Sequence, residues 1–176
     1  MIIYFLRHAS AGQHLPNPKK DEKRALDDAG MQQCGEVGRA LSALDVQVDM
    51  VISSPLKRAA QTAALVGNEI GFEGKIVFDD ALRPGACFAD FRKMVGKYAR
   101  YEALMVVGHN PNLSEFLGRS VGEGAGEASI PLKKGGVARV ETSRNSGELQ
   151  WCLTPRVVRS LQAAAAESSR PKTSRK

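Results

Sequence analysis

Long apolar runs and paired cysteines are both missing from this sequence. The longest apolar stretches, such as Met1–Leu6, are too short to span a bilayer, and no signal-peptide pattern accompanies them. The three cysteines, Cys34, Cys87 and Cys152, are odd in number and lack paired spacing, which argues against a disulfide framework and against a zinc site. We therefore expect a protein of the reducing cytoplasm that binds no membrane.

The remaining composition is that of one folded domain with a basic end. The chain has 176 residues, of which 43% are hydrophobic, and this is enough to bury a core. Most of the net charge of +6 lies in residues 156–176, which hold six Lys or Arg and one Glu. A basic face for nucleic acid would normally involve the folded body, so the charge argues against a nucleic-acid partner. We expect a domain over residues 1–160 and a basic, Ala/Ser-rich, partly disordered tail over 161–176.

Strand-like apolar segments alternate with segments of helical periodicity along the chain. The expected strands lie near residues 1–6, 48–52, 75–78 and 104–107, and the expected helices near 29–43, from Ser54 and Pro55, over 90–98, from Asn110 and Pro111, and from Leu161. Loops are expected at 9–25 and 122–126, and a hairpin at 137–141 and 149–153 around a turn at 143–147. The alternation predicts an α/β three-layer sandwich, with a mostly parallel central sheet and helices on both faces.

Polar motifs follow three of the predicted strands at the point where each strand ends. Arg7 and His8 follow the first strand, the segment from Ser54 to Arg58 follows the second, and His109 follows the fourth. Ligands of open α/β sheets bind at these carboxyl ends. Two of the motifs also run into predicted helix N-termini, whose free N–H groups favour anions. We therefore expect two histidines and two arginines to converge on an anion site.

This combination of side chains suits phosphoryl transfer. Catalysis of that reaction is mostly positioning and electrostatic stabilisation of the charged equatorial oxygens. The guanidinium groups of Arg7 and Arg58 can grip phosphate oxygens in pairs, which Lys cannot. A neutral His8 is a competent nucleophile that would form a phosphohistidine intermediate. The cationic side chains supply the charge, so no metal or other cofactor is required.

Each of these residues also has a plainer interpretation when it is taken alone. Arg7 and His8 could end an edge strand, Arg58 could be a solvated helix residue, and His109 could sit beside a helix cap. The functional hypothesis depends on their convergence, which the sequence predicts only through the strand ends.

Three motifs resemble the histidine phosphatase superfamily, and they occur in that family's order. They are Arg7-His8-Ala9, the specific stretch Ser54-Pro55-x-x-Arg58-x-x-Gln61-Thr62, and Gly108-His109-Asn110. The resemblance covers about residues 1–153. It implies a phosphohistidine-forming His8 in a phosphate pocket lined by Arg7, Arg58 and His109. Arg24, Ser10 and Asn110 are the further substrate-binding candidates.

The short length and two local patterns resemble the SixA-type phosphohistidine phosphatases within that superfamily. The patterns are Arg24-Ala25-Leu26 leading into Gly30, and Leu82-Arg83-Pro84-Gly85. Two positions depart from the wider family. Ala9 replaces the usual Gly, which should be tolerated unless the position needs a positive φ. Pro84 stands where members that act on phosphate esters place a Glu general acid.

The missing acid predicts the substrate class. An alcohol leaving group benefits from a positioned proton donor, whereas a phosphorylated imidazole leaves as neutral imidazole with little help. We therefore expect a phosphohistidine protein, such as a phosphotransfer domain, as partner and substrate.

A small-molecule phosphomonoesterase or mutase is the alternative function, with Asp80 or Glu115 supplying the proton. A non-catalytic phosphoprotein-binding module is the third hypothesis, but it would not need His8. Nothing in the sequence assigns an oligomeric state.

Overall fold

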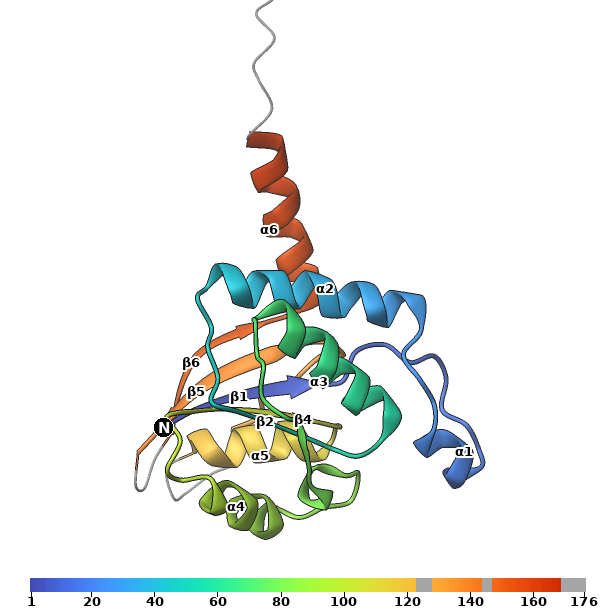
Figure 1. Ribbon diagram of the computed structural model, residues 1–176, viewed down its shortest axis with the longest axis vertical. Coiled ribbons are helices and arrows are strands. Elements are labelled where there is room, and N and C mark those ends of the chain that lie inside the picture. The colour runs from blue at the N-terminus through green and yellow to red at the C-terminus, as the bar shows by residue number, and fades with distance from the viewer. Residues whose placement is uncertain (123–127, 144–146, 169–176) are drawn as a thin grey trace, which may run out of the picture.

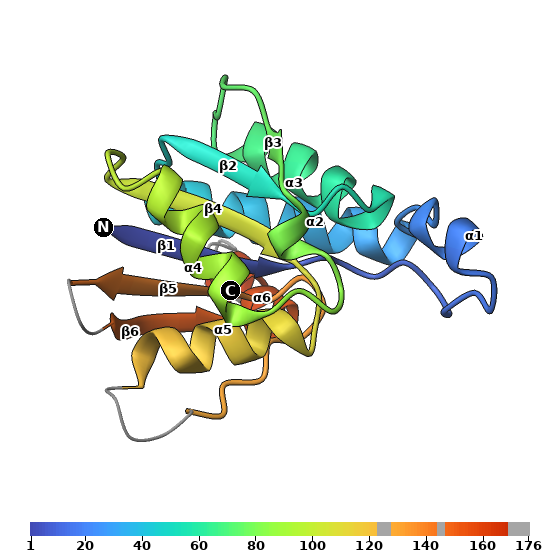
Figure 2. The ribbon, with the colours of Figure 1, turned by 90° about the horizontal axis from the view of Figure 1, so that it is seen from below.

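A six-stranded mixed sheet forms the middle of the protein (Figure 1). The computed structural model describes residues 1–122, 128–143 and 147–168. The strands, in chain order, are β1 (Ile2–Arg7), β2 (Met50–Ser53), β3 (Val77–Phe78), β4 (Ala103–Gly108), β5 (Val137–Thr142) and β6 (Gly147–Leu153). Their spatial order is β3-β2-β4-β1-β5-β6, as Figure 2 shows. The pairs β3/β2, β2/β4 and β4/β1 are parallel, whereas β1/β5 and β5/β6 are antiparallel.

Helices cover both faces of this sheet, which confirms the predicted three-layer α/β architecture (Figure 1). One face carries α2 (Asp28–Ala43) and α3 (Lys57–Glu69), and α6 (Pro155–Ser168) begins beside α2 and runs away from the sheet. The other face carries α4 (Phe88–Lys97) and α5 (Asn112–Val121). A short helix, α1 (Pro18–Glu22), stands beyond the carboxyl end of β1, and a single 3₁₀ turn, η1 (Asp80–Leu82), precedes α4.

The two central strands divide their side chains between two separate cores. On β1, Tyr4 and Leu6 pack beneath α2 and α3, whereas Ile3 and Phe5 pack toward α4 and α5. All six residues of β4 are buried. Because a strand that is covered on both faces needs no polar side, β1 and β4 appear in the sequence as continuous apolar runs. The two cores fix the carboxyl ends of β1 and β4 at neighbouring positions.

The starts of two helices and one expected loop differ from the sequence prediction. Residues 9–25 contain α1, because the Asn17 side chain caps its N-terminus and Pro18 opens it, so the prediction of a plain loop was wrong. Helix α3 begins at Lys57 rather than at Ser54. Its N-cap is Leu56, which makes no side-chain capping bond. Helix α5 similarly begins at Asn112, after Pro111.

In the carboxyl-terminal part, the predicted hairpin is present, and the predicted helix begins earlier in the chain than Leu161. Strands β5 and β6 form the expected antiparallel pair. Residues 123–127, 144–146 and 169–176 lie outside the described structure, and they include most of the expected 122–126 loop, the 143–147 turn and the end of the 161–176 tail. Helix α6 begins at Pro155 and crosses residue 160. Within the described ranges, no helix combines the length and apolarity that crossing a membrane requires.

Candidate active site

The three polar motifs converge at the carboxyl edge of the sheet. Strands β2, β4 and β1 are neighbours, so the residues that follow them are brought together. His8 and His109 lie with their ring centroids 4.9 Å apart and their planes inclined at 53°. Together with Arg7 and Arg58 they line a cavity of about 490 Å³. The structure thus brings together the four residues that the sequence predicted as catalytic.

His8 is held in the tautomer that a nucleophile requires. Its Nδ1 lies 2.7 Å from the carbonyl oxygen of Ala9. Because a carbonyl oxygen can only accept a hydrogen bond, Nδ1 carries the proton and Nε2 keeps its lone pair. Burial, together with the smaller effect of the positive charges of Arg58 and Arg7, lowers the pKa of His8 to about 4. The imidazole is therefore neutral, with Nε2 available for attack, at neutral pH.

His109 is oriented by a serine at the end of the neighbouring strand. Its Nε2 lies 2.9 Å from the hydroxyl oxygen of Ser54, and its Nδ1 is buried without a protein partner. Burial, followed by the neighbouring His8 and Arg58, lowers the pKa of His109 to about 2, so this ring is also neutral. If the Ser54 hydroxyl donates to Nε2, then Nδ1 carries the proton and can donate to an oxyanion. Ser54 therefore positions His109 and does not cap α3.

Arg7 and Arg58 both line the cavity, and each is held by a hydrogen bond to a backbone carbonyl. The Nη1 of Arg7 donates to the carbonyl of Leu132 at 2.8 Å, and the Nη1 of Arg58 donates to the carbonyl of Asp21 at 2.9 Å. In both guanidinium groups Nε is buried without a protein partner. Burial lowers the pKa of both groups, but arginine stays charged at neutral pH. Each arginine therefore keeps its Nε side available for a phosphoryl oxygen.

Asp21, from α1, holds Arg58 and Arg24 in place, and the sequence analysis did not single it out. Its Oδ1 accepts from the Nε of Arg24 at 2.7 Å, and its Oδ2 lies 3.3 Å from the Nη1 of Arg58. The hydrogen bond from Arg24 is the largest effect that lowers the pKa of Asp21, so this buried carboxylate stays ionised. The negative charge offsets part of the positive charge in the cavity. Its only sequence signal was the Asn17-Pro18 helix start that precedes it.

The polar residues of the stretch after β2 each make a contact that explains their spacing. Gln61 accepts a hydrogen bond from the backbone of Leu26 at 2.9 Å. Thr62 accepts one from the backbone of Ala9 at 3.1 Å and donates to the carbonyl of Arg58 at 2.7 Å. One face of α3 therefore fixes the segment that carries His8. Ala9 itself is fully buried and is not among the described non-glycine residues with positive φ, which explains why Ala replaces Gly there without strain.

The three further substrate-binding candidates occupy different places. Arg24 lines the cavity, with Nη1 donating to the carbonyl of Ala11 at 2.6 Å. Asn110 lines it too, and its Nδ2 donates to Leu132 while its Oδ1 is buried without a protein partner. Ser10 is absent from the lining, and its hydroxyl donates to Asp27 at 2.8 Å. The structure therefore gives Ser10 a role in holding the loop against the start of α2.

No candidate carboxylate of the sequence analysis lines the cavity. Pro84 does line it, at the position where an acid was missing. Asp80 is exposed and paired with Arg83 at 2.6 Å, and Glu115 is paired with Arg119 on α5. The two carboxylates in the lining are Asp21 and Glu22. Glu22 is half-exposed and accepts from Arg83 at 2.9 Å.

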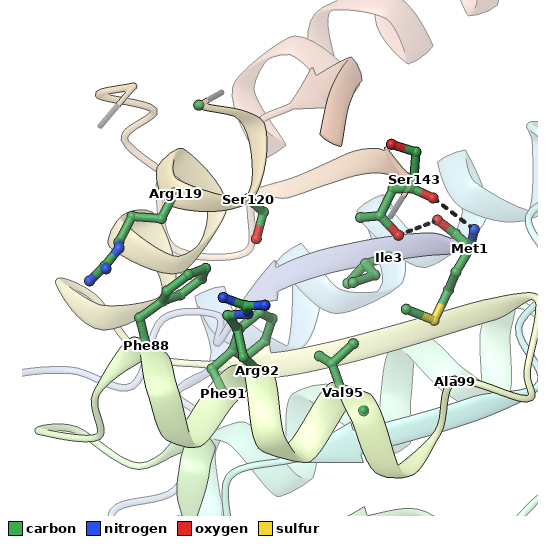
Figure 3. Close-up of a pocket in the computed structure, with 13 residues that line it drawn as sticks. Met1, Ile3, Phe88, Phe91, Arg92, Val95, Ala99, Arg119, Ser120 and Ser143 are labelled. Atoms are coloured by element: carbon green, nitrogen blue, oxygen red, sulfur yellow. Dashed lines mark hydrogen bonds between the residues drawn. The ribbon is translucent and has the colours of Figure 1, made fainter. Parts of the chain in front are cut away.

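A second cavity lies at the opposite end of β1 and offers different chemistry. It has a volume of about 560 Å³ and opens between α4 and α5 (Figure 3). Phe88, Phe91 and Val95 of α4 face it, and Arg92 and Arg119 flank it. Among the described residues that line it there is no His, Cys, Asp or Glu. The groups suited to phosphoryl transfer therefore lie at the carboxyl edge and not here.

Comparison with known proteins agrees with this geometry. Residues 3–87 match the model of the histidine phosphatase superfamily (branch 1). The resemblance to the histidine phosphatase superfamily is confirmed. The matched range contains the His8 and Arg58 motifs of this histidine phosphatase pattern, while His109 lies beyond it.

Solved histidine phosphatase structures share the fold over almost their whole length. The protein histidine phosphatase SixA in complex with tungstate superposes with a TM-score of 0.79 at 19% identity, over 89% of this chain and 98% of that one. The SixA structure from Agrobacterium tumefaciens gives a TM-score of 0.73 at 25% identity, over 88% of this chain and 97% of that one.

The Pgam5 relatives are longer proteins than this chain. The serine/threonine-protein phosphatase Pgam5 of Drosophila mojavensis, a mitochondrial protein, is 36% identical over 85 residues, which is 48% of this chain. The chain spans 28% of the length of that relative.

Proposed function

We propose that this protein is a metal-independent phosphatase that removes the phosphoryl group from phosphohistidine on a protein. In the first step the Nε2 lone pair of His8 forms a bond to phosphorus while the bond from phosphorus to the substrate nitrogen breaks. The substrate imidazole, protonated on its other ring nitrogen, leaves as neutral imidazole. The Nε sides of Arg7 and Arg58 and the Nδ1–H of His109 stabilise the equatorial oxygens. Water then attacks the phosphorus of the phosphorylated His8, the bond from phosphorus to Nε2 breaks, and inorganic phosphate takes up the water oxygen and protons. His8 leaves as neutral imidazole because its Nδ1 keeps the proton that it donates to the Ala9 carbonyl.

One observation carries the choice of substrate: the cavity contains the phosphoryl-binding groups, and both carboxylic acids in its lining are already paired with arginines. Asp21 is ionised between Arg24 and Arg58, and Glu22 accepts from Arg83. Pro84 cannot donate a proton. Imidazole needs little assistance as a leaving group, whereas an alkoxide does. The names of the SixA and Pgam5 relatives support a phosphorylated protein as the partner. The three free thiols support a reducing compartment such as the cytoplasm.

The test is a leaving-group series. kcat/KM is measured on a phosphohistidine peptide, on phosphoramidate, on aryl phosphates of graded leaving-group pKa and on alkyl phosphates. We expect rapid turnover of both P–N substrates, a steep dependence among the aryl esters and almost no alkyl activity. His8→Ala should abolish phosphate release and the trapped phosphoenzyme, whereas a variant that kept near-normal turnover would rule out His8 as the nucleophile. A flat dependence on leaving-group pKa would contradict the proposed substrate class.

A phosphate ester is the second candidate because Glu22 lines the cavity and is half-exposed. If Glu22 supplied a proton to an ester oxygen, Glu22→Gln would lower activity on alkyl phosphates and leave phosphoramidate turnover unchanged. The proposed phosphohistidine activity predicts no such selective loss. A non-catalytic binding module is disfavoured by the free Nε2 of His8, which such a module would not need.

A further inference from the structure

The cavity carries more positive charge than a single phosphoryl group requires. Its charged lining consists of five cationic side chains and two carboxylates, with His8 and His109 neutral: Arg7, Arg24, Arg58, Arg83 and Lys134 against Asp21 and Glu22. The carboxylates are already paired with arginines of the same cavity. Like Arg7, and unlike the other three arginines of the lining, Lys134 has no carboxylate within ion-pair distance among the described residues. Against the effect of burial, the hydrogen bond from Ser10 and, more weakly, the charge of Lys134 lower the pKa of Asp27.

Lys134 lies on a turn that is fixed to the end of β1. The backbone N–H of Gly135 lies 3.1 Å from the carbonyl of Arg7 and 3.2 Å from that of His8. Gly135 has a φ of +68°, and a Cβ on Gly136 would lie 2.8 Å from the Lys133 carbonyl, so this tight turn requires both glycines. The charge of Lys134 reaches the nucleophile, since it contributes to lowering the pKa of His8.

Exposed lysines continue this charge outside the cavity on two segments of the chain. Lys133 is exposed next to Lys134 on the 132–136 turn. On the second segment, Lys19 and Lys23 are exposed and lie directly next to Pro18 and Glu22 in the chain, both of which line the cavity. Helix α1, which carries Lys19 and is followed by Lys23, stands at the carboxyl end of β1 (Figure 1). We name Lys19, Lys23, Lys133 and Lys134 the basic rim.

We propose that the basic rim docks an acidic protein surface around the phosphorylated residue, an inference that rests on the proposed function. Exposed lysines on two separate segments that border the cavity can contact carboxylates that flank the phosphohistidine on its own protein. A small metabolite held by Arg7 and Arg58 would leave the outer lysines unused. A nucleic acid would use aromatic platforms for its bases, and apart from the two catalytic rings and His14 the described lining contains no aromatic side chain.

The experiment uses two synthetic peptides that differ only in the residues flanking one phosphohistidine, which are Glu in one and Lys in the other. At low ionic strength the full-length protein should dephosphorylate the acidic peptide with a kcat/KM about tenfold higher. Salt should reduce this ratio, because the rim charges are exposed. Phosphoramidate, which reaches no rim lysine outside the cavity, should show little dependence on salt.

A matched pair of variants distinguishes the effect of the basic rim from the effect of the protein's net charge. Lys23→Glu combined with Lys133→Glu reverses two rim charges that do not line the cavity. Lys75→Glu combined with Lys93→Glu makes the same change in net charge at exposed positions before β3 and on α4. The rim variant should lose or invert the peptide preference and keep its phosphoramidate turnover. The control variant should keep both.

Equal kcat/KM on the two peptides, or a preference that survives in the rim variant, would overturn the inference while leaving the proposed function intact. Loss of the preference in the control variant would overturn it as well. Equal peptide rates together with rim-dependent retention of a single-stranded RNA oligonucleotide would reassign the surface to nucleic acid. Activity on aryl phosphates without activity on phosphoramidate or either peptide would overturn the inference and the proposed function together.

Discussion

At the scale of single residues, the site depends on how two arginines are oriented. Arg7 and Arg58 each give Nη1 to a backbone carbonyl and retain Nε for the substrate. This arrangement needs a planar guanidinium with several donors, because one group must satisfy the protein and the phosphoryl oxygens together. A lysine ammonium in the same place would hold one charge without that geometry.

Arg58→Lys should therefore lower kcat/KM by about 10²–10³-fold although the charge is kept. The comparison is Lys57→Ala, which removes an exposed cation at the adjacent position of α3 and should change the rate little. Steady-state kinetics on an aryl phosphate measure both. Wild-type rates in Arg58→Lys would show that net charge alone is sufficient.

The protonation of His8 predicts the acid side of the pH profile. Protonation removes the Nε2 lone pair, so activity is lost as pH falls through the pKa of His8, which burial lowers to about 4. kcat/KM on an aryl phosphate, corrected for ionisation of the substrate, should stay level from pH 7 to about 5 and reach half its value near pH 4. A half-value near 6.5, the ordinary histidine pKa, would contradict the burial argument. His109, with a pKa of about 2, should not contribute in this range.

Sequence reasoning found the four central residues because they follow apolar strands, but it could not find the residues that orient them. Ser54 and Thr62 were recognised only as part of a motif, and their contacts with His109 and Ala9 cross between separate elements. Asp21 lay in a segment predicted as a loop. The turn that carries Lys134 is brought to the site by backbone bonds to Arg7 and His8, a relation with no local sequence signal.

At the scale of secondary-structure elements, the start of α2 is packed directly against the loop that follows β1. Gly30 makes this possible, since a Cβ at this position would lie 2.0 Å from the carbonyl oxygen of Ser10. Asp27 joins the same two elements by capping α2 at Gly30 and accepting from Ser10. The loop that leaves His8 is thereby held by a helix from the layer above the sheet.

Gly30→Ala should force these elements apart and lower the free energy of unfolding by about 1–3 kcal/mol, as overpacking typically does. The matched control is Gly96→Ala in α4, where a Cβ meets nothing within 4 Å. That substitution should be neutral or stabilising by up to about 1 kcal/mol. Chemical denaturation measures both values. Equal free energies of unfolding for the two variants would mean that the loop at Ser10 can shift to accommodate the Cβ without cost, and would contradict the close-packing argument.

Element types were predictable from the sequence, whereas several element boundaries were not. The apolar runs of β1 and β4 and the alternation of β5 and β6 identified those strands. The start of α3 was misplaced because a Ser-Pro pair is typical of a helix N-terminus, while the Ser54 hydroxyl is used by His109 instead. The hydrogen bond between Ser54 and His109 therefore replaces the helix-capping role that a Ser-Pro pair usually favours.

At the scale of the whole molecule, α6 joins the carboxyl-terminal segment to the body of the domain. Val158 is buried in the core beneath α2, and Arg159 pairs with the buried Glu36 at 2.9 Å. Beyond these residues the contact is weaker: Leu161 is exposed, and Gln162 donates to the carbonyl of Glu36 at 3.4 Å. The contacts that anchor α6 to the domain, made by Val158 and Arg159, therefore lie before residue 160, the predicted end of the folded domain.

Two truncations should separate the anchor from the tail. A chain that ends at Ser160 keeps Val158 and Arg159, so it should fold and should turn over phosphoramidate at the full rate. A chain that ends at Thr154 loses both, and burial of Val158 alone is worth about 1.5–3 kcal/mol. Thermal unfolding and turnover are measured for each. A chain ending at Ser160 that fails to fold would place the boundary further along α6.

The unpartnered donors of the site predict how the whole domain responds to simple anions. An oxyanion that bonds to Arg7, Arg58 and His109 binds the folded state alone, so phosphate, sulfate or tungstate should raise Tm as its concentration increases. At a concentration 100 times Kd the gain is about 2.7 kcal/mol. Chloride at equal ionic strength is the control, and Arg58→Lys should reduce the gain. No shift with any oxyanion would contradict the assignment of these donors.

Those donors also place the protein under the control of its own product. The two arginines are held by backbone carbonyls and His109 by the Ser54 hydroxyl, so their unpartnered nitrogens are positioned for inorganic phosphate as they are for a phosphoryl group. Affinity for the transferring group is therefore also affinity for free phosphate. We expect phosphate to be a competitive inhibitor, so that turnover slows where phosphate accumulates and rises again where it is consumed.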